Sequence, residues 1–481
     1  MSLGLSGVAA ASRADTLPDA IALAYQTNPT LQSQRAQLRA LDESYVQAHA
    51  GFRPQASAQL QGAYAKGPST FDTGITTDAA ALMITQPLYT GGLTSAQVRA
   101  AQADILSGRQ RLRQVEATVL QSVIQAYVDV RRNQQALAIS QENVAVLRHQ
   151  LEETKARFDV GQITRTDTAQ AQARLAAAQA QLSSAQSALA ISRVAYAAVV
   201  GQSPGDLAPE PALTGLPATV DQAFDAAEKD NPGVLLADYA EQAAAARVAA
   251  AKSAYRPNVS LSASLGYEGS LTNAPSLGLR SGMYDQNVTA AATLTQPLFA
   301  GGMNASRIRE ALENDNTQRL GVESARRQAM QAVAQGWNQL LAARSATVSN
   351  QEQVKADEIA FEGVKQEADV GLRTTLDVLN AEQELRSAQL ALVDARHDQY
   401  VAAASVLNAM GLLEIQNLDS SVPAYNPETS FRRVKHAGAV PWEGLVAGLD
   451  GVGAPSIHTR PVSQPLALPA TPAQAGSVVE P

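Results

Sequence analysis

The chain has 481 residues, of which 45% are apolar but only 4% are Phe, Trp or Tyr, so aliphatic side chains supply most of its hydrophobicity. Globular cores usually hold more aromatic bulk, and this composition is more typical of long packed helices than of an enzyme. The 37 basic and 45 acidic residues give a net charge of −8, which argues against general nucleic-acid binding, and the absence of cysteine excludes disulfides and thiolate chemistry.

The N-terminus has features of an export signal. Residues 3–11 are small and apolar, and Ser12-Arg13-Ala14 has the small-x-small pattern of a signal-peptidase site, although the basic segment that should come first is missing. We therefore expect residues 1–14 to be the remnant of an export signal; the alternative is an unstructured terminus. No run of about 18 apolar residues occurs, so the sequence predicts no transmembrane helix.

The next four hundred or so residues contain an internal sequence repeat with two copies, which predicts a duplicated domain with an internal two-fold repeat. The repeats span residues 15–201 and 221–418, and residues 202–220 link them. Each repeat has the same motifs in the same order. The pairs are Asn28-Pro29 and Asn231-Pro232, Arg53-Pro54 and Arg256-Pro257, Thr85-Gln86-Pro87-Leu88 and Thr295-Gln296-Pro297-Leu298, Gly91-Gly92 and Gly301-Gly302, and Val160-Gly161 and Val370-Gly371.

Early in each repeat the hydrophobic pattern alternates with a period of two, which predicts β-hairpins over residues 55–88 and 258–298. In the second hairpin Val259, Leu261 and Ala263 alternate with serines. Strands of about ten residues with one apolar and one uncharged polar face suit a tilted transmembrane barrel. Because the smallest such barrels need about eight strands, four strands per chain require oligomerisation.

The rest of each repeat is predicted to be helical. Residues 93–158 contain no proline, and leucines and alanines recur at heptad spacing in the returning helix, which predicts a long antiparallel coiled coil. Gly161 and Gly371 mark the hairpin tips. Thr164-x-x-Asp167 and Thr374-x-x-Asp377 then have the pattern of capping boxes that begin the returning helices.

The segment from 419 to 481 loses this periodicity and is rich in proline, so we expect a partly disordered tail. Within it, residues 440–445 include Trp442 and Leu445, and we expect this patch to pack against the helical body.

The duplicated order of helix, hairpin, long helix, Val-Gly tip and returning helix resembles the TolC family of outer-membrane channel-tunnels. The motifs that carry the resemblance are the paired ones given above, together with residues 370–379, and they cover about residues 16–418. The resemblance implies an α+β membrane protein: a homotrimer in which four strands per chain form one 12-stranded transmembrane β-barrel, continued by a helical barrel across the periplasm.

The resemblance also implies a function. Such a protein is a passive exit duct in the outer membrane of a Gram-negative bacterium, embedded in outer-membrane lipid, without a cofactor or metal. It works with a periplasmic adaptor (a membrane fusion protein) and an inner-membrane ABC exporter or proton-driven pump. Residues 425–428 and 431–434 resemble type I secretion members from alphaproteobacteria, which favours protein export; multidrug efflux is the alternative.

Three sets of site residues follow from motif position in this family. A periplasmic gate would use Arg373 as donor, Thr166 and Asp167 as its partners, and Asp377 as an acidic ring; Asn380 stands where better-studied members carry a second acid. The tips that dock the adaptor would be Val160, Gly161, Val370, Gly371, Leu372 and Thr374. The junction between barrel and tunnel would comprise Arg53, Pro54, Gln86, Pro87, Gly91, Gly92, Arg256, Pro257, Gln296, Pro297, Gly301 and Gly302.

Other interpretations remain open at this point. Asp167 and Asp377 are explained equally well as helix caps. A coiled-coil scaffold without a pore would account for the heptads but not for the four alternating strands. The five histidines lack metal-site spacing and no catalytic motif occurs, so an enzyme has no supporting residues.

Overall fold

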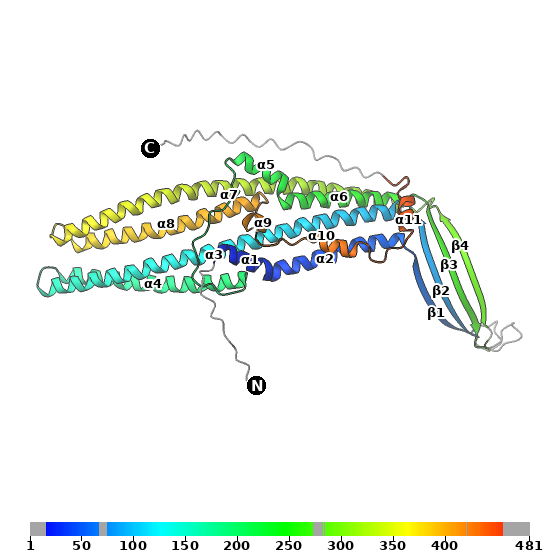
Figure 1. Ribbon diagram of the computed structural model, residues 1–481, viewed down its shortest axis with the longest axis horizontal. Helices are drawn as coiled ribbons and strands as arrows, with labels where there is room; N and C mark the ends of the chain where they lie inside the picture. The colour runs from blue at the N-terminus through cyan, green and yellow to red at the C-terminus, as the bar shows by residue number, and fades with distance from the viewer. Residues whose placement is uncertain (1–15, 67–74, 273–281, 283, 420, 456–481) are drawn as a thin grey trace. The chain divides into compact units, whose positions relative to one another are not determined.

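The computed structural model describes residues 16–66, 75–272, 282, 284–419 and 421–455. It consists of long helices and one four-stranded sheet (Figure 1). The region 1–14 and the end of the tail lie outside the described residues. The first repeat contains α1 Leu17–Thr27, α2 Pro29–His49, the 3-10 turn η1 Ala50–Phe52, β1 Gln55–Ala65, β2 Ile75–Tyr89, α3 Leu93–Asp159 and α4 Arg165–Val200.

The second repeat contains the same order of helices and strands, as the duplicated sequence predicts, but no counterpart of η1 among its described residues. They are α5 Val220–Asp230, α6 Pro232–Ser253, β3 Asn258–Ser270, β4 Tyr284–Thr295, α7 Met303–Asp369 and α8 Thr375–Ala409. The segment that follows forms α9 Ile415–Leu418, α10 Pro427–Val434 and α11 Glu443–Gly451. The described part of the proline-rich tail is therefore more ordered than its loss of periodicity predicts.

The Asn-Pro motifs show how closely the two repeats agree. The Asn28 side-chain oxygen accepts hydrogen bonds from the first turn of α2, and its Nδ2 donates to the Val199 carbonyl at 3.0 Å. Asn231 does the same for α6, and its Nδ2 donates to the Ala409 carbonyl at 2.8 Å. Each asparagine thus caps one helix and fastens it to the end of the returning helix.

The four strands form a single antiparallel sheet in the order β1-β2-β3-β4. Residues directly opposite each other share a face, and the register places Ala58, Leu82, Leu265 and Val288 in one row across all four strands. The neighbouring row is Ser57, Met83, Ser264 and Thr289. The predicted separation into one apolar and one mostly polar face therefore runs across the whole sheet.

The chain folds as two compact units, and neither coincides with a repeat. Within the described residues, the first unit comprises the chain up to Glu43 with Ile105–Leu236 and Ala325–Lys435; the second comprises Ser44–Asp104, Ala237–Ser324 and the segment from His436. The units differ from the repeats because α2, α3, α6 and α7 each contribute to both units and because strands of both repeats pair in one sheet.

The first unit contains the main hydrophobic core, which is built from α1, α2, α3, α4 and the end of α8. Tyr127 and Tyr196 are fully buried there. A second cluster lies toward the hairpin tips, where Ala171 and Ala178 of α4 pack with Leu147 of α3 and Leu379 of α8. Buried alanines at these seam positions confirm the close helix pairing that the heptads predict.

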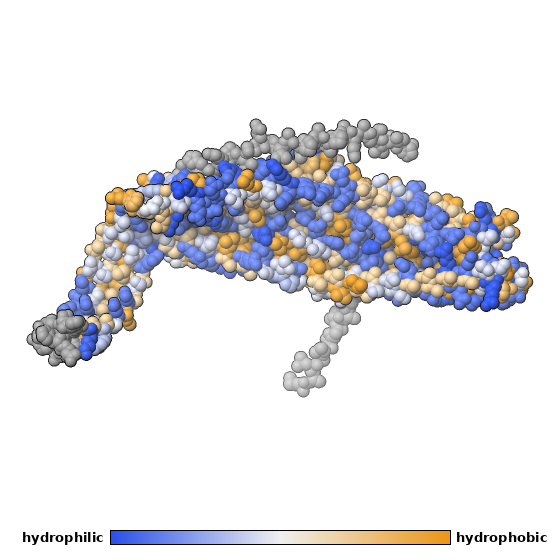
Figure 2. All heavy atoms as spheres, turned by 180° about the vertical axis from the view of Figure 1, so that it is seen from behind, coloured by the Kyte–Doolittle hydropathy of each residue, from blue (hydrophilic) through white to orange (hydrophobic). Residues whose placement is uncertain are grey.

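The second unit contains the sheet, and most of its strand residues are exposed in the single chain. In the space-filling view the strand region shows less of the saturated blue that marks hydrophilic residues on the helices (Figure 2). Large apolar side chains on the strands, such as Leu60 and Val288, are open to the surroundings. Within the described ranges, every helix is too short or too polar to span a bilayer.

Candidate functional site

The tips of the two helical hairpins have the same geometry. Gly161 and Gly371 adopt φ of 76° and 81°, a left-handed conformation that favours glycine. At each tip the next residue donates from its backbone to the carbonyl at the end of the long helix: Gln162 to Arg157 and Leu372 to Glu367, both at 2.9 Å. These bonds close the helix ends and leave Val160, Val370 and Leu372 exposed at the tips.

The returning helices begin with the predicted capping boxes. The Asp167 backbone donates to the Thr164 hydroxyl, and the Asp167 carboxylate accepts from the Thr164 backbone at 2.9 Å. Thr374 and Asp377 repeat the pattern, with a distance of 3.0 Å for the second bond. The side-chain and backbone hydrogen bonds from Thr164 lower the pKa of Asp167, and those from Thr374 lower the pKa of Asp377. The capping interpretation is confirmed, and both carboxylates carry charge at neutral pH.

Arg373 is exposed and pairs within its own hairpin: its Nε donates to the Glu367 carboxylate at 2.8 Å. Thr166 is exposed on the other hairpin. The structure of one chain therefore shows a different partner for Arg373 from those that the family position implies. A contact from Arg373 to Thr166 or Asp167 stays a prediction for the assembled channel.

Other residues connect the two hairpins of a single chain. Arg174 of α4 donates to the Asn380 side-chain oxygen of α8 at 3.1 Å. Arg157, at the end of α3, pairs with Asp369, at the end of α7, at 3.3 Å. Farther from the tips, His397 Nε2 of α8 contacts the Asp129 carboxylate of α3 at 2.7 Å. That hydrogen bond raises the pKa of His397, although burial opposes the shift.

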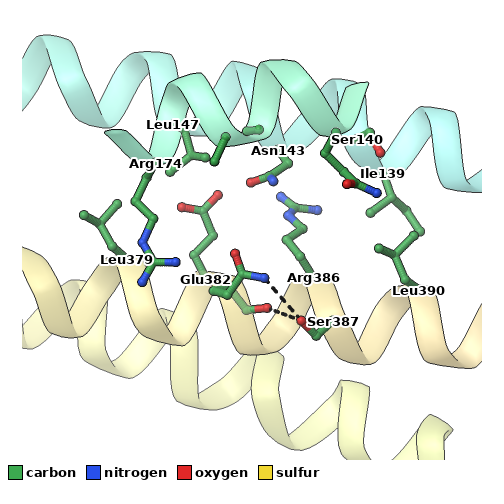
Figure 3. Close-up of a pocket in the computed structure, with 14 residues that line it drawn as sticks. Ile139, Ser140, Asn143, Leu147, Arg174, Leu379, Glu382, Arg386, Ser387 and Leu390 are labelled. Carbon is green, nitrogen blue, oxygen red and sulfur yellow. Dashed lines mark hydrogen bonds between the residues drawn. The ribbon is translucent and has the colours of Figure 1, made fainter. Parts of the chain in front are cut away.

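A cavity of about 380 Å³ lies between these hairpins (Figure 3). Glu382 and Arg386 point from α8 toward α3 and α4, and Arg174 and Asn143 are among the other polar residues that line the cavity. Both α8 side chains are buried, and the Glu382 Oε1 atom has no hydrogen-bond partner. Burial raises the pKa of Glu382 to about 7, and Arg386 opposes the shift. The carboxyl is therefore close to half-protonated at neutral pH.

Sequence reasoning missed Glu382 and Arg386, although a signal was present. Leu379, Glu382, Arg386 and Leu390 follow one another at spacings of three or four along α8. This is a second buried stripe, separate from the heptad seam of α8, because α8 packs against the first hairpin as well as against α7. Because Glu382 and Arg386 are charged, the sequence pattern alone suggests that this side of α8 faces solvent.

The Gln-Pro motifs lie where the strands meet the long helices, in the second compact unit. Gln86 Nε2 donates to the Phe52 and Pro87 carbonyls at 2.9 and 2.6 Å. Gln296 Nε2 makes the equivalent bonds to the Tyr255 and Pro297 carbonyls, both at 3.1 Å. Each glutamine thus ties the end of one strand of its hairpin to the chain that enters the other.

The first of these junctions is closed by the C-terminal segment. Arg53 Nε pairs with the Glu443 carboxylate at 2.9 Å, and His49 Nδ1 contacts the same carboxylate at 2.8 Å. Burial alone would raise the pKa of Glu443, but the hydrogen bonds from Arg53 and His49 lower it. The fully buried Asp450 carboxylate accepts from the backbone at Gly92 and from backbone and hydroxyl groups of Thr90 and Ser95. Asp450 therefore caps α3 from the far end of the sequence.

Among the described residues, no comparable segment covers the second junction. Leu298 and Phe299, which correspond to Leu88 and Tyr89, are almost fully exposed. A β-carbon added to Gly302 would meet no atom within 4 Å, whereas one added to Gly92 would touch Ala454 at 3.0 Å. The two junctions therefore share their local turns but differ in what packs on them.

Within the ranges that the structure describes, no three His, Asp or Glu side chains are grouped so that they could hold a metal ion. What the geometry provides is a pair of helical hairpins with charged tips and a sheet whose edges and faces are open in one chain.

Paired long hairpins joined to a four-stranded antiparallel sheet define the class of outer-membrane channel-tunnels. The chain belongs to the outer membrane efflux protein family, whose model matches residues 20–202 and 223–412. It is similar to the outer membrane efflux protein BepC of Brucella suis, with 34% identity over 92% of this chain and 94% of BepC. The expected TolC-family membership is confirmed, and the protein is an outer-membrane export channel protein.

The similarity to more distant relatives also covers most of the chain. The outer membrane protein TolC of Escherichia coli is 25% identical over 89% of both chains, and the alkaline protease secretion protein AprF of Pseudomonas aeruginosa is 25% identical over 73% of both. A crystal structure of a membrane protein from Pseudomonas aeruginosa has the same fold, with a TM-score of 0.71 and 20% identity over 82% of this chain and 90% of that one.

Proposed function

We propose that three copies of this chain form a passive duct, with their sheets joined into one closed barrel of twelve strands. The observation that carries this proposal is the open sheet. Strands β1 and β4 are its two edges in one chain, and an edge with unpaired backbone groups is not tolerated in lipid. Pairing β4 of one copy with β1 of the next removes all edges. Heat-resistant trimers in outer-membrane fractions would support the proposal; monomers after mild detergent extraction would contradict it.

The helical hairpins would then form the periplasmic tunnel, and their tips would be both gate and docking site. Val160, Val370 and Leu372 are exposed apolar side chains on the tips, which suits contact with an adaptor protein. Charged Asp167 and Asp377 lie beside them. No described group supports catalysis, so transport energy and any chemistry would come from an inner-membrane partner.

For the gate, we propose that Arg373 exchanges its contact with Glu367 for Thr166 and Asp167 on a neighbouring hairpin when the channel closes. The residue is exposed and its present partner is only six positions away in sequence, so the exchange requires a side-chain rotation and little else. Single-channel conductance of Arg373→Ser combined with Asp167→Ala tests this. Higher conductance than the wild type would support it, and unchanged conductance would remove the gate from this position.

For the cargo, we propose type I protein secretion with an ABC exporter. Support comes from the tail motifs around Tyr425 and Phe431 and from the similarity to AprF, a protein named for protease secretion. The second candidate is drug efflux with a proton-driven pump, which the name of the more similar BepC favours. Deleting the gene and measuring both secreted protein and drug susceptibility separates the two: loss of secretion with unchanged susceptibility is the expected result.

A further inference from the structure

Helix α11 carries an exposed apolar stripe. Leu445 and Leu449 lie four residues apart and share one side of the helix. Trp442, just before the helix, and Val452, its C-cap, extend this stripe at spacings of three. The exposed fraction is 75% for Leu445, 56% for Leu449, 68% for Val452 and 47% for Trp442. The remaining exposed positions of α11 are glycines, so nothing charged interrupts this side.

The opposite side of α11 is fixed to the protein. Val446 and Asp450 are buried, and Asp450 caps α3 through the hydrogen bonds described above. Glu443, at the first turn, is held by Arg53 and His49. The orientation of the helix is therefore set by polar contacts on one side, which leaves the apolar stripe turned outward and without a partner among the described residues.

The register of the strands shows on which face of the sheet α11 lies. The indole Nε1 of Trp442 donates to the Gln86 side-chain oxygen at 3.1 Å. Gln86 pairs with Leu261, two residues along β2 from the pair Ile84 and Ala263, and alternate residues of a strand share a face. Gln86 therefore ends the apolar face of the sheet, and α11 lies at that end of the strands (Figure 1).

We propose that α11 is an interfacial membrane helix that inserts its stripe of Trp442, Leu445, Leu449 and Val452 among the phospholipids of the outer membrane. The apolar face of the sheet is the surface that contacts acyl chains, and α11 continues that surface at the end of the strands. A tryptophan with an apolar body and a hydrogen-bonded indole N–H is typical of the headgroup level. A short helix with one apolar side and no exposed charge on it suits shallow insertion.

The chain contains no cysteine, so a single introduced cysteine carries the only spin label in each copy of the chain. Site-directed spin labelling can therefore test the proposal. Leu445→Cys and Leu449→Cys, labelled in the purified full-length oligomer and reconstituted in phosphatidylethanolamine and phosphatidylglycerol vesicles, should be accessible to oxygen and shielded from a water-soluble nickel chelate. Leu60→Cys on the apolar face of the sheet is the lipid control, and Leu372→Cys at the hairpin tip is the water control.

The outcomes are distinct. Labels on α11 that behave like Leu60→Cys support the proposal. Labels accessible to the nickel chelate would place α11 in water, and labels shielded from both reagents would place it against a neighbouring subunit; either result overturns it while leaving the channel intact. If Leu60→Cys itself contacted water, the membrane assignment of the sheet would fail as well.

Tryptophan fluorescence gives an independent measurement. The chain has two tryptophans, so Trp337→Phe leaves Trp442 as the sole emitter, and Trp442→Phe leaves Trp337 as a matched control. Trp337 packs at the edge of a helical core cluster built from α5, α7 and α8. In vesicles of brominated phospholipid, Trp442 emission should fall at least about twofold while Trp337 emission is unchanged. Equal quenching of both, or of neither, would contradict the insertion of α11.

Discussion

The guanidinium of Arg174 donates a hydrogen bond to the side-chain oxygen of Asn380, which joins the two hairpins of one subunit close to their tips. Asn380 lies one helical turn after Asp377 in α8. We expect Asn380→Asp to make the channel about three- to tenfold more sensitive to block by a trivalent cation, because each subunit gains a second carboxylate near the entrance. Single-channel recordings with added La³⁺ measure this.

Asn380→Leu is the control for that experiment, since it removes the contact to Arg174 without adding charge. It should leave cation block unchanged. Equal block in both variants would mean that the effect comes from loosened hairpins and not from a carboxylate ring.

Glu382→Gln should stabilise the hairpins at high pH and have little effect at low pH. Burial raises the pKa of this carboxyl from 4.5 to about 7, so the packed state is favoured when the group is neutral. That stability is fully present below pH 4.5 and is lost as the pH rises through about 7. Glutamine stays neutral, and we expect a gain of roughly 2 to 3 kcal/mol per subunit at pH 8. Thermal unfolding at pH 5 and pH 8 provides the comparison, and an equal shift at both would refute it.

His397→Gln should lower the thermal stability of the protein, and the loss should be larger at low pH than at high pH. The hydrogen bond to Asp129 raises the pKa of His397 above 6.5, so the contact is strongest below that pH and fades as the pH rises through the folded-state pKa. We expect a larger loss of thermal stability at pH 6 than at pH 8.5. A pH-independent loss would show that the imidazole acts only as a packed ring.

Gly411→Ala should be far more damaging than Gly201→Ala, although both glycines end a returning helix with positive φ. A β-carbon at Gly411 would lie 2.4 Å from the Asp230 carbonyl oxygen, whereas at Gly201 its nearest neighbour is the Thr27 hydroxyl at 3.5 Å. Gly201→Ala carries only the backbone strain of about 1 to 2 kcal/mol. Gly411→Ala must also displace the end of α5, and a loss of assembled trimer in the membrane is the expected result. Similar trimer yields would contradict the close approach.

Asp450→Asn should destabilise the start of α3 by about 2 to 4 kcal/mol, because an amide cannot accept all the donors that the buried carboxylate satisfies. Burial alone would raise the pKa of Asp450, but hydrogen bonds from Thr90 and Ser95 lower it below 3.8. The stabilisation is therefore present above about pH 4 and lost as the pH falls further. Hydrogen exchange of the α3 amides next to Asp450 should accelerate in the variant; Asp419→Asn, whose carboxylate contacts the adjacent Ser421, is the matched control.

Repetition made much of the fold predictable. The strands, the Asn-Pro caps, the hairpin tips and both capping boxes each occur twice, and a local pattern that recurs in the same order is far stronger than a single one. Thr164 and Asp167 could be assigned from spacing alone because a capping box involves only four neighbouring residues.

The parts that resisted prediction depend on contacts distant in sequence. Helices α10 and α11 are too short to show a clear hydrophobic period, and the many prolines around them suggest a segment without helices. One local signal was present, because Asn426 before Pro427 repeats the capping pattern of Asn28 before Pro29. Nothing near Asp450 indicates that it caps α3. Glu382 is buried only because a second hairpin covers it.

The cap of α3 has a consequence for how the protein is made. Gly92 and Asp450 are 358 residues apart, so the ribosome completes the helix long before it supplies the carboxylate that closes its first turn. A nascent or truncated polypeptide keeps those amide groups unsatisfied at the base of its sheet. A chain that ends before Asp450 therefore lacks the carboxylate that accepts from the Gly92 and Ser95 backbone at the start of α3.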